Sequence, residues 1–238
     1  MIVVSELSKI YRRGIEAVEI ERSDGSSYLR TVDFVRAVQN VSFSVLKGEF
    51  VLIVGRSGSG KSTLLSILGG LTVPTHGVVR LNDKDLRSMS DEALSRLRAE
   101  YIGFVFQFSG LLPTLNVLEN VTLPSLFVRA KEDPVKRARK LLQDVGLDSK
   151  IQSFPSELSG GELKRAAIAR ALINDPLLIL ADEPTGDLDV DTEREIMELF
   201  KEVNRQGKTI LMVTHNPELS SYSSRVITMD KGNIKENK

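Results

Sequence analysis

The chain of 238 residues has no cysteine, no tryptophan and only two histidines. Without cysteine it has neither a disulfide framework nor a thiolate metal site, so we expect any metal ion to be held by oxygen ligands. Lysine plus arginine and aspartate plus glutamate number 32 each, which leaves no net charge at pH 7. This balance gives no reason to expect nucleic acid or an anionic membrane surface as a partner.

Long apolar runs are also missing. No run approaches the roughly 18 apolar residues that a membrane helix needs, and residues 1–10 lack the basic and apolar segments of a signal peptide. We therefore expect a protein that is soluble by itself and cytoplasmic. At this length the chain can bury a substantial core, and we expect one domain with a smaller lobe.

A glycine-rich stretch at residues 55–62, here called the phosphate loop, reads Gly-Arg-Ser-Gly-Ser-Gly-Lys-Ser. It follows the apolar run 50–54 and precedes a helical pattern, so it joins a strand to a helix. Such a loop directs backbone N–H groups and a helix N-terminus at an anion. In this spacing Lys61 reaches the β- and γ-phosphates of a nucleotide, and Ser62 reaches Mg²⁺. A plain Gly/Ser turn is the alternative, which the flanking strand and helix disfavour.

Two acidic residues end a strand that the sequence predicts to be buried. The unbroken apolar run 177–181 is typical of a parallel strand, and Asp182 and Glu183 follow it. At the carboxyl end of such a strand, one acid suits a Mg²⁺ ligand and the other a base that polarises water. The strands predicted at 101–106 and 209–214 similarly end at Gln107 and His215, although each of these two residues alone is more often plain surface.

Helical patterns cover much of the remaining chain. Ser90 is expected to cap a helix that reaches Ala99, and Asp133 one that ends at Gly146. In the segment 158–162, here called the signature segment, Ser159 and Glu162 form a capping box. Its glycines at 160 and 161 weaken a helix by about 1 kcal/mol each, which is understandable if a phosphate must touch bare backbone there.

The first third of the chain is predicted to be mostly antiparallel strand, with a hairpin at 14–36 around an Asp-Gly turn. The expected fold is α/β, with a mostly parallel sheet, an N-terminal antiparallel β subdomain and a small helical subdomain. We expect residues 1–88 and 162–238 to form the core, 89–161 the helical lobe and 14–36 an insertion. All belong to a single domain.

Taken in order, these motifs resemble the ATP-binding subunit of ABC transporters over essentially the whole chain. The residues that carry the resemblance are Tyr11, 55–62, Gln107, 158–162, 177–183, 187–189 and His215. The stretches 105–107, 111–113, 118–121 and 182–189 are similar to the subgroup that serves lipoprotein release, macrolide export and antimicrobial-peptide export. The resemblance implies a P-loop NTPase core that hydrolyses ATP with Mg²⁺.

The resemblance also implies a role for each matched residue. The residues expected to wrap the phosphates are Gly55, Arg56, Ser57, Gly58, Ser59, Gly60, Lys61, Ser62 and Thr63. Tyr11 would stack on adenine, Asp182 would hold Mg²⁺ through water, and Gln107 would contact Mg²⁺ and the attacking water. Glu183 would be the general base, arranged by His215, which also contacts the γ-phosphate.

Ser159, Gly160 and Gly161 would meet ATP bound to a second subunit, because the family dimerises head to tail around two ATP molecules. The subunits would form a homodimer, or a heterodimer with a similar chain. They would attach to transmembrane permease subunits at the inner face of the cell membrane, through a groove near Gln107. No nucleic acid is expected.

The chain departs from the family pattern in two places. Glu162 stands where the signature usually has glutamine, and we expect it to serve the helix cap because a carboxylate would repel the γ-phosphate. The segment 14–35 is longer than the family's usual link after the adenine-stacking aromatic, which puts the role of Tyr11 in doubt. Two other functions compete: an ABC-type ATPase acting on DNA or ribosomes, and a sensor that binds ATP without hydrolysis. ABC-type ATPases that act on DNA or ribosomes usually carry a coiled-coil insertion or two tandem cassettes, and this chain has neither. The presence of both Glu183 and His215 disfavours a sensor that does not hydrolyse ATP.

Overall fold

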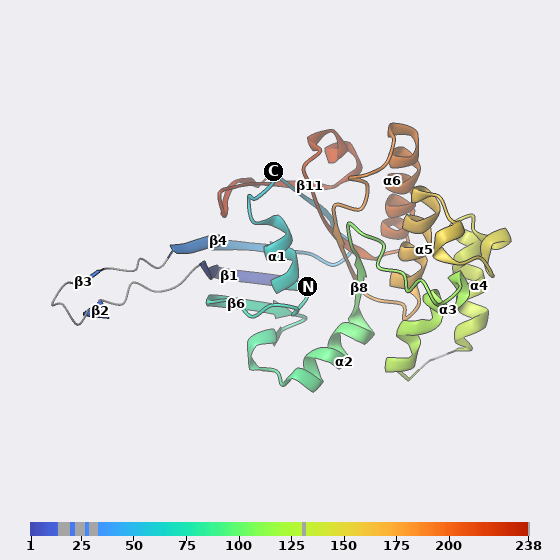
Figure 1. Cartoon of the computed structure of the whole chain (residues 1–238), viewed down its shortest axis with the longest axis horizontal. Helices are drawn as coiled ribbons and strands as arrows, with labels where there is room; N and C mark the ends of the chain where they lie inside the picture. Colours follow the sequence, from blue (N-terminus) through green and yellow to red (C-terminus); the bar gives the residue numbers. More distant parts are fainter. Residues whose placement is uncertain (14–19, 22–26, 29–32, 130–131, 238) are drawn as a thin grey trace.

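The computed structural model describes residues 1–238 except 14–19, 22–26, 29–32, 130–131 and 238 (Figure 1). Its strands are β1 (Ile2–Arg13), β2 (Ile20–Glu21), β3 (Ser27–Tyr28), β4 (Asp33–Val45), β5 (Phe50–Val54), β6 (His76–Leu81), β7 (Lys84–Asp85), β8 (Ile102–Val105), β9 (Leu178–Asp182), β10 (Thr209–Thr214), β11 (Arg225–Asp230) and β12 (Asn233–Asn237). Its α-helices are α1 (Lys61–Leu68), α2 (Asp91–Tyr101), α3 (Val117–Thr122), α4 (Pro134–Asp144), α5 (Gly160–Leu172) and α6 (Val190–Arg205). Short 3₁₀ helices cover Leu86–Ser88, Leu123–Phe127, Asp148–Lys150, Pro155–Glu157 and Pro217–Tyr222.

The larger sheet has the strand order β12-β11-β5-β10-β9-β8. All its neighbouring strands are parallel except β12, which pairs antiparallel with β11 at the edge. Every residue of β5 and of β10 is buried, which explains their near-continuous apolar sequence. The carboxyl ends of β5, β9 and β10 lie at the same edge of the sheet. There the phosphate loop follows β5, Asp182 ends β9 and His215 follows β10.

The smaller sheet is antiparallel, with the order β4-β1-β6-β7. Helix α1 lies between the two sheets (Figure 1). Its buried Leu64 belongs to the same core cluster as Leu7 of β1 and Leu211 of β10. This shared core fixes the helix that follows the phosphate loop against both sheets.

Helices α5 and α6 cover the opposite face of the parallel sheet. Ile168 and Phe200 pack there against Ile179 of β9 in a second core cluster. A third cluster joins α3, α4 and the outer side of α5, with Val121 and Leu142 fully buried. We call α3, α4 and the residues that pack with them the helical lobe, which lies at the right of Figure 1. Because α5 belongs to both clusters, it connects the lobe to the sheet.

The predicted fold class is confirmed, as are the side-chain caps at Ser90, Asp133 and Ser159. Helix α3 was not predicted, although Asn116 and Glu119 form a capping box at its start. Strands β2 and β3 pair antiparallel, but most of 14–36 lies outside the described residues, so the hairpin insertion stays a prediction. The boundaries of core and lobe stay predictions too. In the described part of the chain, no helix is long and apolar enough to cross a membrane.

Candidate functional site

The phosphate loop curls between β5 and α1 with glycine where the backbone needs it. Gly60 caps α1 in the left-handed conformation, with φ of 99°. A Cβ atom there would lie 2.0 Å from the carbonyl oxygen of Ala37, so no larger residue fits. Lys61 is 5% exposed, and its Nζ donates to the carbonyl oxygens of Gly55 at 2.8 Å and Arg56 at 3.2 Å. The buried ammonium thus lies inside the loop, with two neutral carbonyl groups as its hydrogen-bond acceptors.

The phosphate loop also contains two serine hydroxyls, which can donate to an anion or coordinate a hard cation. The buried Ser59 Oγ has no hydrogen-bond partner among the described residues, which is unusual for a buried hydroxyl. Ser62 Oγ donates to Asp182 Oδ1 at 2.9 Å. A serine hydroxyl beside a carboxylate is a donor set that Mg²⁺ prefers. Burial raises the pKa of Asp182, and the hydrogen bond from Ser62 opposes that rise.

Glu183 lies at the centre of the site. Its backbone has φ of 46°, a left-handed conformation that is costly for a residue with a side chain and is typical of functional positions. One carboxylate oxygen lies 3.6 Å from Lys61 Nζ. The other lies 2.7 Å from Nδ1 of His215 and accepts the His215 backbone N–H at 3.2 Å. These two contacts fix the Glu183 carboxylate against the ring and the backbone of His215.

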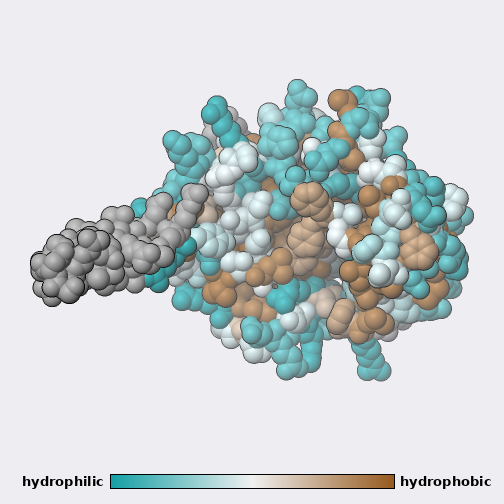
Figure 2. Space-filling view, in the orientation of Figure 1, coloured by the Kyte–Doolittle hydropathy of each residue, from teal (hydrophilic) through white to brown (hydrophobic). Residues whose placement is uncertain are grey.

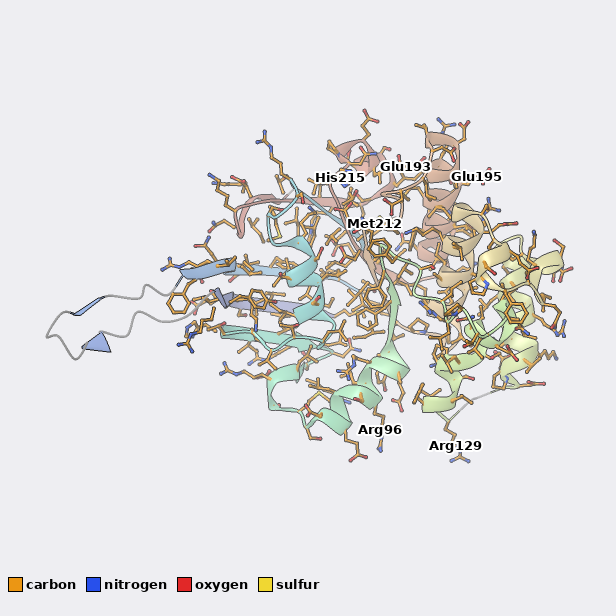
Figure 3. All side chains as sticks on the ribbon, in the orientation of Figure 1. Arg96, Arg129, Glu193, Glu195, Met212 and His215 are labelled. Carbon is orange, nitrogen blue, oxygen red and sulfur yellow. The ribbon has the colours of Figure 1, made fainter. Side chains whose placement is uncertain are left out.

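Figure 3 shows the position of His215 beyond the end of β10. Met212 lies within the buried strand, and His215 lies just beyond its end, near Glu193 of α6. Glu193 accepts hydrogen bonds from Thr185 Oγ1 at 2.8 Å and from Asn216 Nδ2 at 3.1 Å. It therefore ties the loop after Glu183 to the loop after His215. Glu193 was not predicted, because its only signal in the sequence is its place in the acidic first turn of α6.

Gln107 follows the end of β8, the strand that pairs with β9. A Cβ atom added to Gly186 would lie 3.9 Å from Gln107 Nε2 and 3.8 Å from Glu183 Cβ, so the Gln107 amide and the Glu183 side chain both approach Gly186. The backbone carbonyl of Gln107 accepts a hydrogen bond from the buried Lys164 of α5. Lys164 was not predicted as a site residue, because no local sequence pattern indicates that a lysine is buried.

The side chains of the signature segment cap α5, the helix that begins within the segment. Ser159 Oγ accepts from the N–H of Glu162, and Glu162 Oε2 accepts from the N–H of Ser159 at 2.8 Å. The expected capping role of Glu162 is therefore confirmed. Gly161 also has a packing reason, because a Cβ there would lie 2.7 Å from the methyl group of Thr192. Gly160 has no contact that tight and is exposed with Ser159.

Tyr11 lies near the phosphate loop through its pairing partner on β4. It pairs with Val35 across β1 and β4, two residues before Ala37, whose carbonyl faces Gly60. Its side chain is 40% exposed, and Lys9 Nζ lies 4.9 Å from the ring centroid. An exposed aromatic ring at this end of β1 is consistent with the predicted stacking, which stays a prediction.

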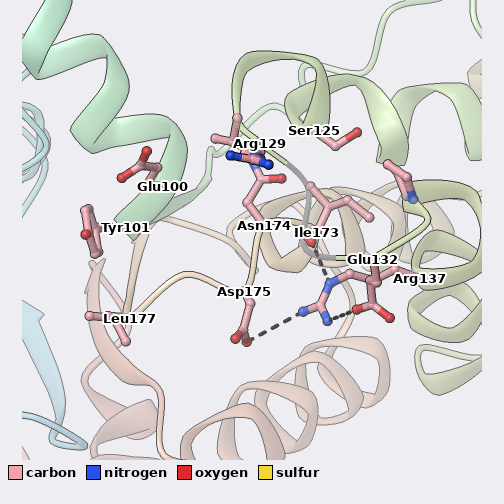
Figure 4. Close-up of a pocket in the computed structure, with 12 residues that line it drawn as sticks. Glu100, Tyr101, Ser125, Arg129, Glu132, Arg137, Ile173, Asn174, Asp175 and Leu177 are labelled. Atoms are coloured by element: carbon pink, nitrogen blue, oxygen red, sulfur yellow. Dashed lines mark hydrogen bonds and ion pairs between the residues drawn. The ribbon is translucent and has the colours of Figure 1, made fainter.

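Two of the cavities that lie away from the phosphate loop border the helical lobe. The larger, of about 760 Å³, is a groove lined by Phe104, Phe106 and Phe127 and by charged residues of α2 and α5. Figure 2 shows apolar side chains gathered between α2 and the helical lobe on this side of the molecule. The smaller cavity, of about 500 Å³, is shown in Figure 4, where Arg137 bonds Glu132, Asp175 and the carbonyl of Ile173. These contacts tie α4 to the end of α5.

The structure thus brings together most residues that the sequence predicted for the site. Those that meet around one point are the phosphate loop with Lys61 and Ser62, Gln107, Asp182, Glu183 and His215. Among the described residues, no hydrogen bond joins Ser159, Gly160 or Gly161 to this group. A single chain therefore presents two separate parts of the predicted site.

Comparisons with known proteins agree with this geometry. The ABC transporter family model matches residues 38–186. The lipoprotein-releasing system ATP-binding protein LolD of Aquifex aeolicus is 48% identical over 198 residues, which cover 83% of this chain and 88% of that protein. The macrolide export ATP-binding/permease protein MacB of Chlorobaculum tepidum is also 48% identical over 198 residues, covering 83% of this chain but 30% of that protein. These names match two of the three transport systems that the sequence resembles.

A solved structure shows the same fold. It is a dimeric ATP-binding cassette in a post-hydrolysis state, bound to ADP and Pi. It superposes with a TM-score of 0.86 at 37% identity, covering 100% of this chain and 98% of the solved one. With the family match, the relatives and the fold in agreement, the chain belongs to the ABC transporter family, as one of its ATP-binding, ATP-hydrolysing subunits.

Proposed function

We propose that Glu183 is the general base of this ATPase and that the phosphate loop, Asp182 and His215 complete the site in the same chain. The observation that carries the proposal is the position of the Glu183 carboxylate, 3.6 Å from Lys61 and 2.7 Å from His215 Nδ1. A carboxylate held at this point can accept a proton from water next to a bound γ-phosphate.

The other residues bind and orient. Phosphate oxygens would replace the weak carbonyl acceptors of Lys61 and meet the N–H groups of the phosphate loop. Ser62 and Asp182 would hold Mg²⁺, the latter through water. The ion, when bound, supplies charge that neutralises the phosphate oxygens. His215 holds the Glu183 carboxylate through Nδ1 and would turn the other edge of its ring toward the γ-phosphate, while the Gln107 amide would contact the attacking water and the ion.

The complete site would require two chains. Ser159 and Gly160 are exposed and unconnected to the phosphate loop of their own chain. Gly160 and Gly161 at the start of α5 offer backbone N–H groups, and Ser159 offers its hydroxyl, to an anion held by another subunit. Head-to-tail pairing of two copies, or of this chain with a similar one, would bring these groups to the partner's ATP. The solved cassette with the same fold is a dimer.

The groove near Gln107 is the place where we propose that transmembrane permease subunits dock, which would attach the chain to the inner face of the membrane. Its charged lining is three arginines and one glutamate, so it favours an acidic partner segment. Its aromatic floor, which includes Phe104 and Phe106 stacked at 5.5 Å, suits the apolar side of a helix. The named relatives belong to transport systems, which disfavours action on DNA or ribosomes.

Glu183→Gln tests the proposal. The amide keeps the shape of the side chain but is a far weaker base, so ATP hydrolysis falls by roughly 10² to 10⁴ while ATP still binds. Light scattering then shows a dimer with ATP and a monomer with ADP, because the closed state is no longer dismantled. The matched control is Glu202→Gln on the exposed side of α6. Hydrolysis at the wild-type rate in Glu183→Gln would refute the assignment.

A further inference from the structure

The segment 107–110, which carries Gln107, is held by side chains of α5. Lys164 Nζ donates to the carbonyl of Gln107. Arg170, two turns further along the same helix, donates to the carbonyls of Ser109 at 2.7 Å and Gly110 at 2.6 Å. In the described part of the chain, residues 107–110 form no backbone hydrogen bonds with other backbone groups. The path of this segment therefore depends on two cations of α5.

These contacts are costly to break. Lys164 is only 5% exposed, and burial lowers its pKa, while the negative charge of Asp187 favours the charged form. Burial also lowers the pKa of Arg170. A buried ammonium or guanidinium that loses its acceptor keeps its desolvation penalty and gains nothing in return. Segment 107–110 is therefore expected to follow α5 when that helix moves.

The position of Lys164 along α5 links two parts of the molecule. It lies about one turn beyond the glycines of the signature segment, which begin the helix. The residue that it holds, Gln107, lies beside Gly186 and hence near Glu183. A displacement of the start of α5 would thus reach the catalytic carboxylate of the same chain through a single hydrogen bond and one short loop.

We propose that Lys164 is a positioning residue that couples the signature segment of one chain to Gln107 in the catalytic site of that same chain. ATP held by the partner subunit at Ser159 and Gly160 fixes α5, α5 fixes Lys164, and Lys164 fixes the backbone that carries the Gln107 amide. Hydrolysis in each site then depends on the nucleotide in the other. This inference rests on the proposed function, since it requires ATP shared between subunits.

The test is a double-mutant cycle on ATP hydrolysis by the full chain with ATP and Mg²⁺. Lys164→Met removes the donor and keeps a long apolar side chain. We expect kcat to fall by about 10- to 100-fold, because a displacement of about 1 Å in a catalytic group can cost as much as roughly 100-fold, with KM within about two-fold. The Hill coefficient for ATP falls relative to the wild type. The control is Lys140→Met, which removes an exposed lysine from α4 and leaves both quantities unchanged.

The cycle separates positioning from a merely structural role. In Gln107→Ala there is no amide left to position, so adding Lys164→Met should lower kcat no further. Additive losses, or an unchanged kcat and Hill coefficient in Lys164→Met, would overturn the proposal. If Lys164→Met melts below the assay temperature, Lys164→Gln, which keeps a donor, enters the same cycle and should show a smaller loss that again vanishes with Gln107→Ala. The proposed function fails separately, only if Glu183→Gln still hydrolyses ATP at the wild-type rate.

Discussion

The two parts of the predicted site differ in how their polar groups are satisfied. On the phosphate-loop side, Lys61 is buried, Ser62 bonds Asp182, and Glu183 is fixed by His215. These groups meet other polar groups of the same chain, whereas the buried Ser59 Oγ has no hydrogen-bond partner among the described residues. On the signature side, Ser159 is exposed, and its side-chain contact is the cap of its own helix.

This difference follows from burial. Most buried polar groups find a partner within the chain, so the side chains of Lys61, Ser62, Asp182 and Glu183 are organised before any ligand arrives. An exposed helix start can be satisfied by water and needs no such organisation. The first side should therefore bind nucleotide as a monomer, and the second should matter only when another subunit approaches. The following substitutions test this division, from the largest expected effect to the smallest.

Lys61→Ala removes the one full positive charge inside the phosphate loop. A charge-assisted hydrogen bond to phosphate contributes enough that the ATP affinity should fall by about 100-fold, with the fold intact. Calorimetry with the monomer measures this. Lys140→Ala, at an exposed position of α4, is the control and should bind as the wild type does. Unchanged affinity in Lys61→Ala would show that the loop does not hold the phosphates.

Ser159→Arg in the Glu183→Gln background places a bulky cation at the opposite part of the site. Because Ser159 is exposed and lies away from the phosphate loop, the ATP affinity of the monomer should stay within about two-fold. The ATP-dependent dimer should weaken by about 30-fold or more, as expected for a residue at the centre of an interface. Light scattering at several protein concentrations checks this. Ser156→Arg, three residues earlier and also exposed, should leave the dimer intact.

Asn120→Ala should destabilise the helical lobe without touching the phosphate-loop side. Asn120 is fully buried; its Nδ2 donates to the carbonyls of Leu112, Leu115 and Asn116, and its Oδ1 accepts from the Leu112 N–H. Removing the amide takes the partner from the Leu112 N–H and the Leu115 carbonyl, whereas the carbonyls of Leu112 and Asn116 keep a backbone donor, so we expect a cost of about 1.5 kcal/mol. Denaturant unfolding measures the loss. A fall in the ATP affinity of the folded monomer would contradict the separation of the two sides.

The features that the sequence predicted well are local. Ser90, Asp133 and Ser159 cap helices through contacts two or three residues away, and such contacts are visible as a pattern in the chain. The parallel strands were likewise indicated by their unbroken apolar runs. Helix α3 was missed although Asn116 and Glu119 carry the capping-box spacing, because six residues are too few for a clear helical period.

The features that the sequence did not reveal depend on which strands become neighbours. Asp182 and Glu183 were recognisable as acids after a strand, but only the order β5-β10-β9-β8 explains why they meet the phosphate loop on one side and Gln107 on the other. The supporting contacts of Glu193 and Lys164 join segments 23 and 57 residues apart. No local pattern distinguishes these two residues from the many exposed acids and lysines of the chain.

Glu162→Gln should have the smallest effect, and it tests why the signature side tolerates a carboxylate. Glutamine also completes a capping box, so at pH 7 the free energy of unfolding should fall by only a few tenths, about 0.3 kcal/mol, from the lost charge at the helix N-terminus. The backbone N–H of Ser159 lowers the pKa of Glu162, with smaller help from Ser159 Oγ and Lys150. A carboxyl whose pKa is lower in the folded state stabilises the protein above its unfolded value, near 4.5, and loses this contribution as the pH falls through the folded value. The difference in the free energy of unfolding between wild type and Glu162→Gln should therefore be constant at neutral pH and disappear in acid, as measured by urea unfolding across pH.

Glu157→Gln, in the 3₁₀ helix just before the signature segment, is a matched control, because Glu157 also accepts a backbone N–H from three residues earlier. If Glu162→Gln instead unfolds much more easily at pH 7, the carboxylate has a structural role beyond the cap.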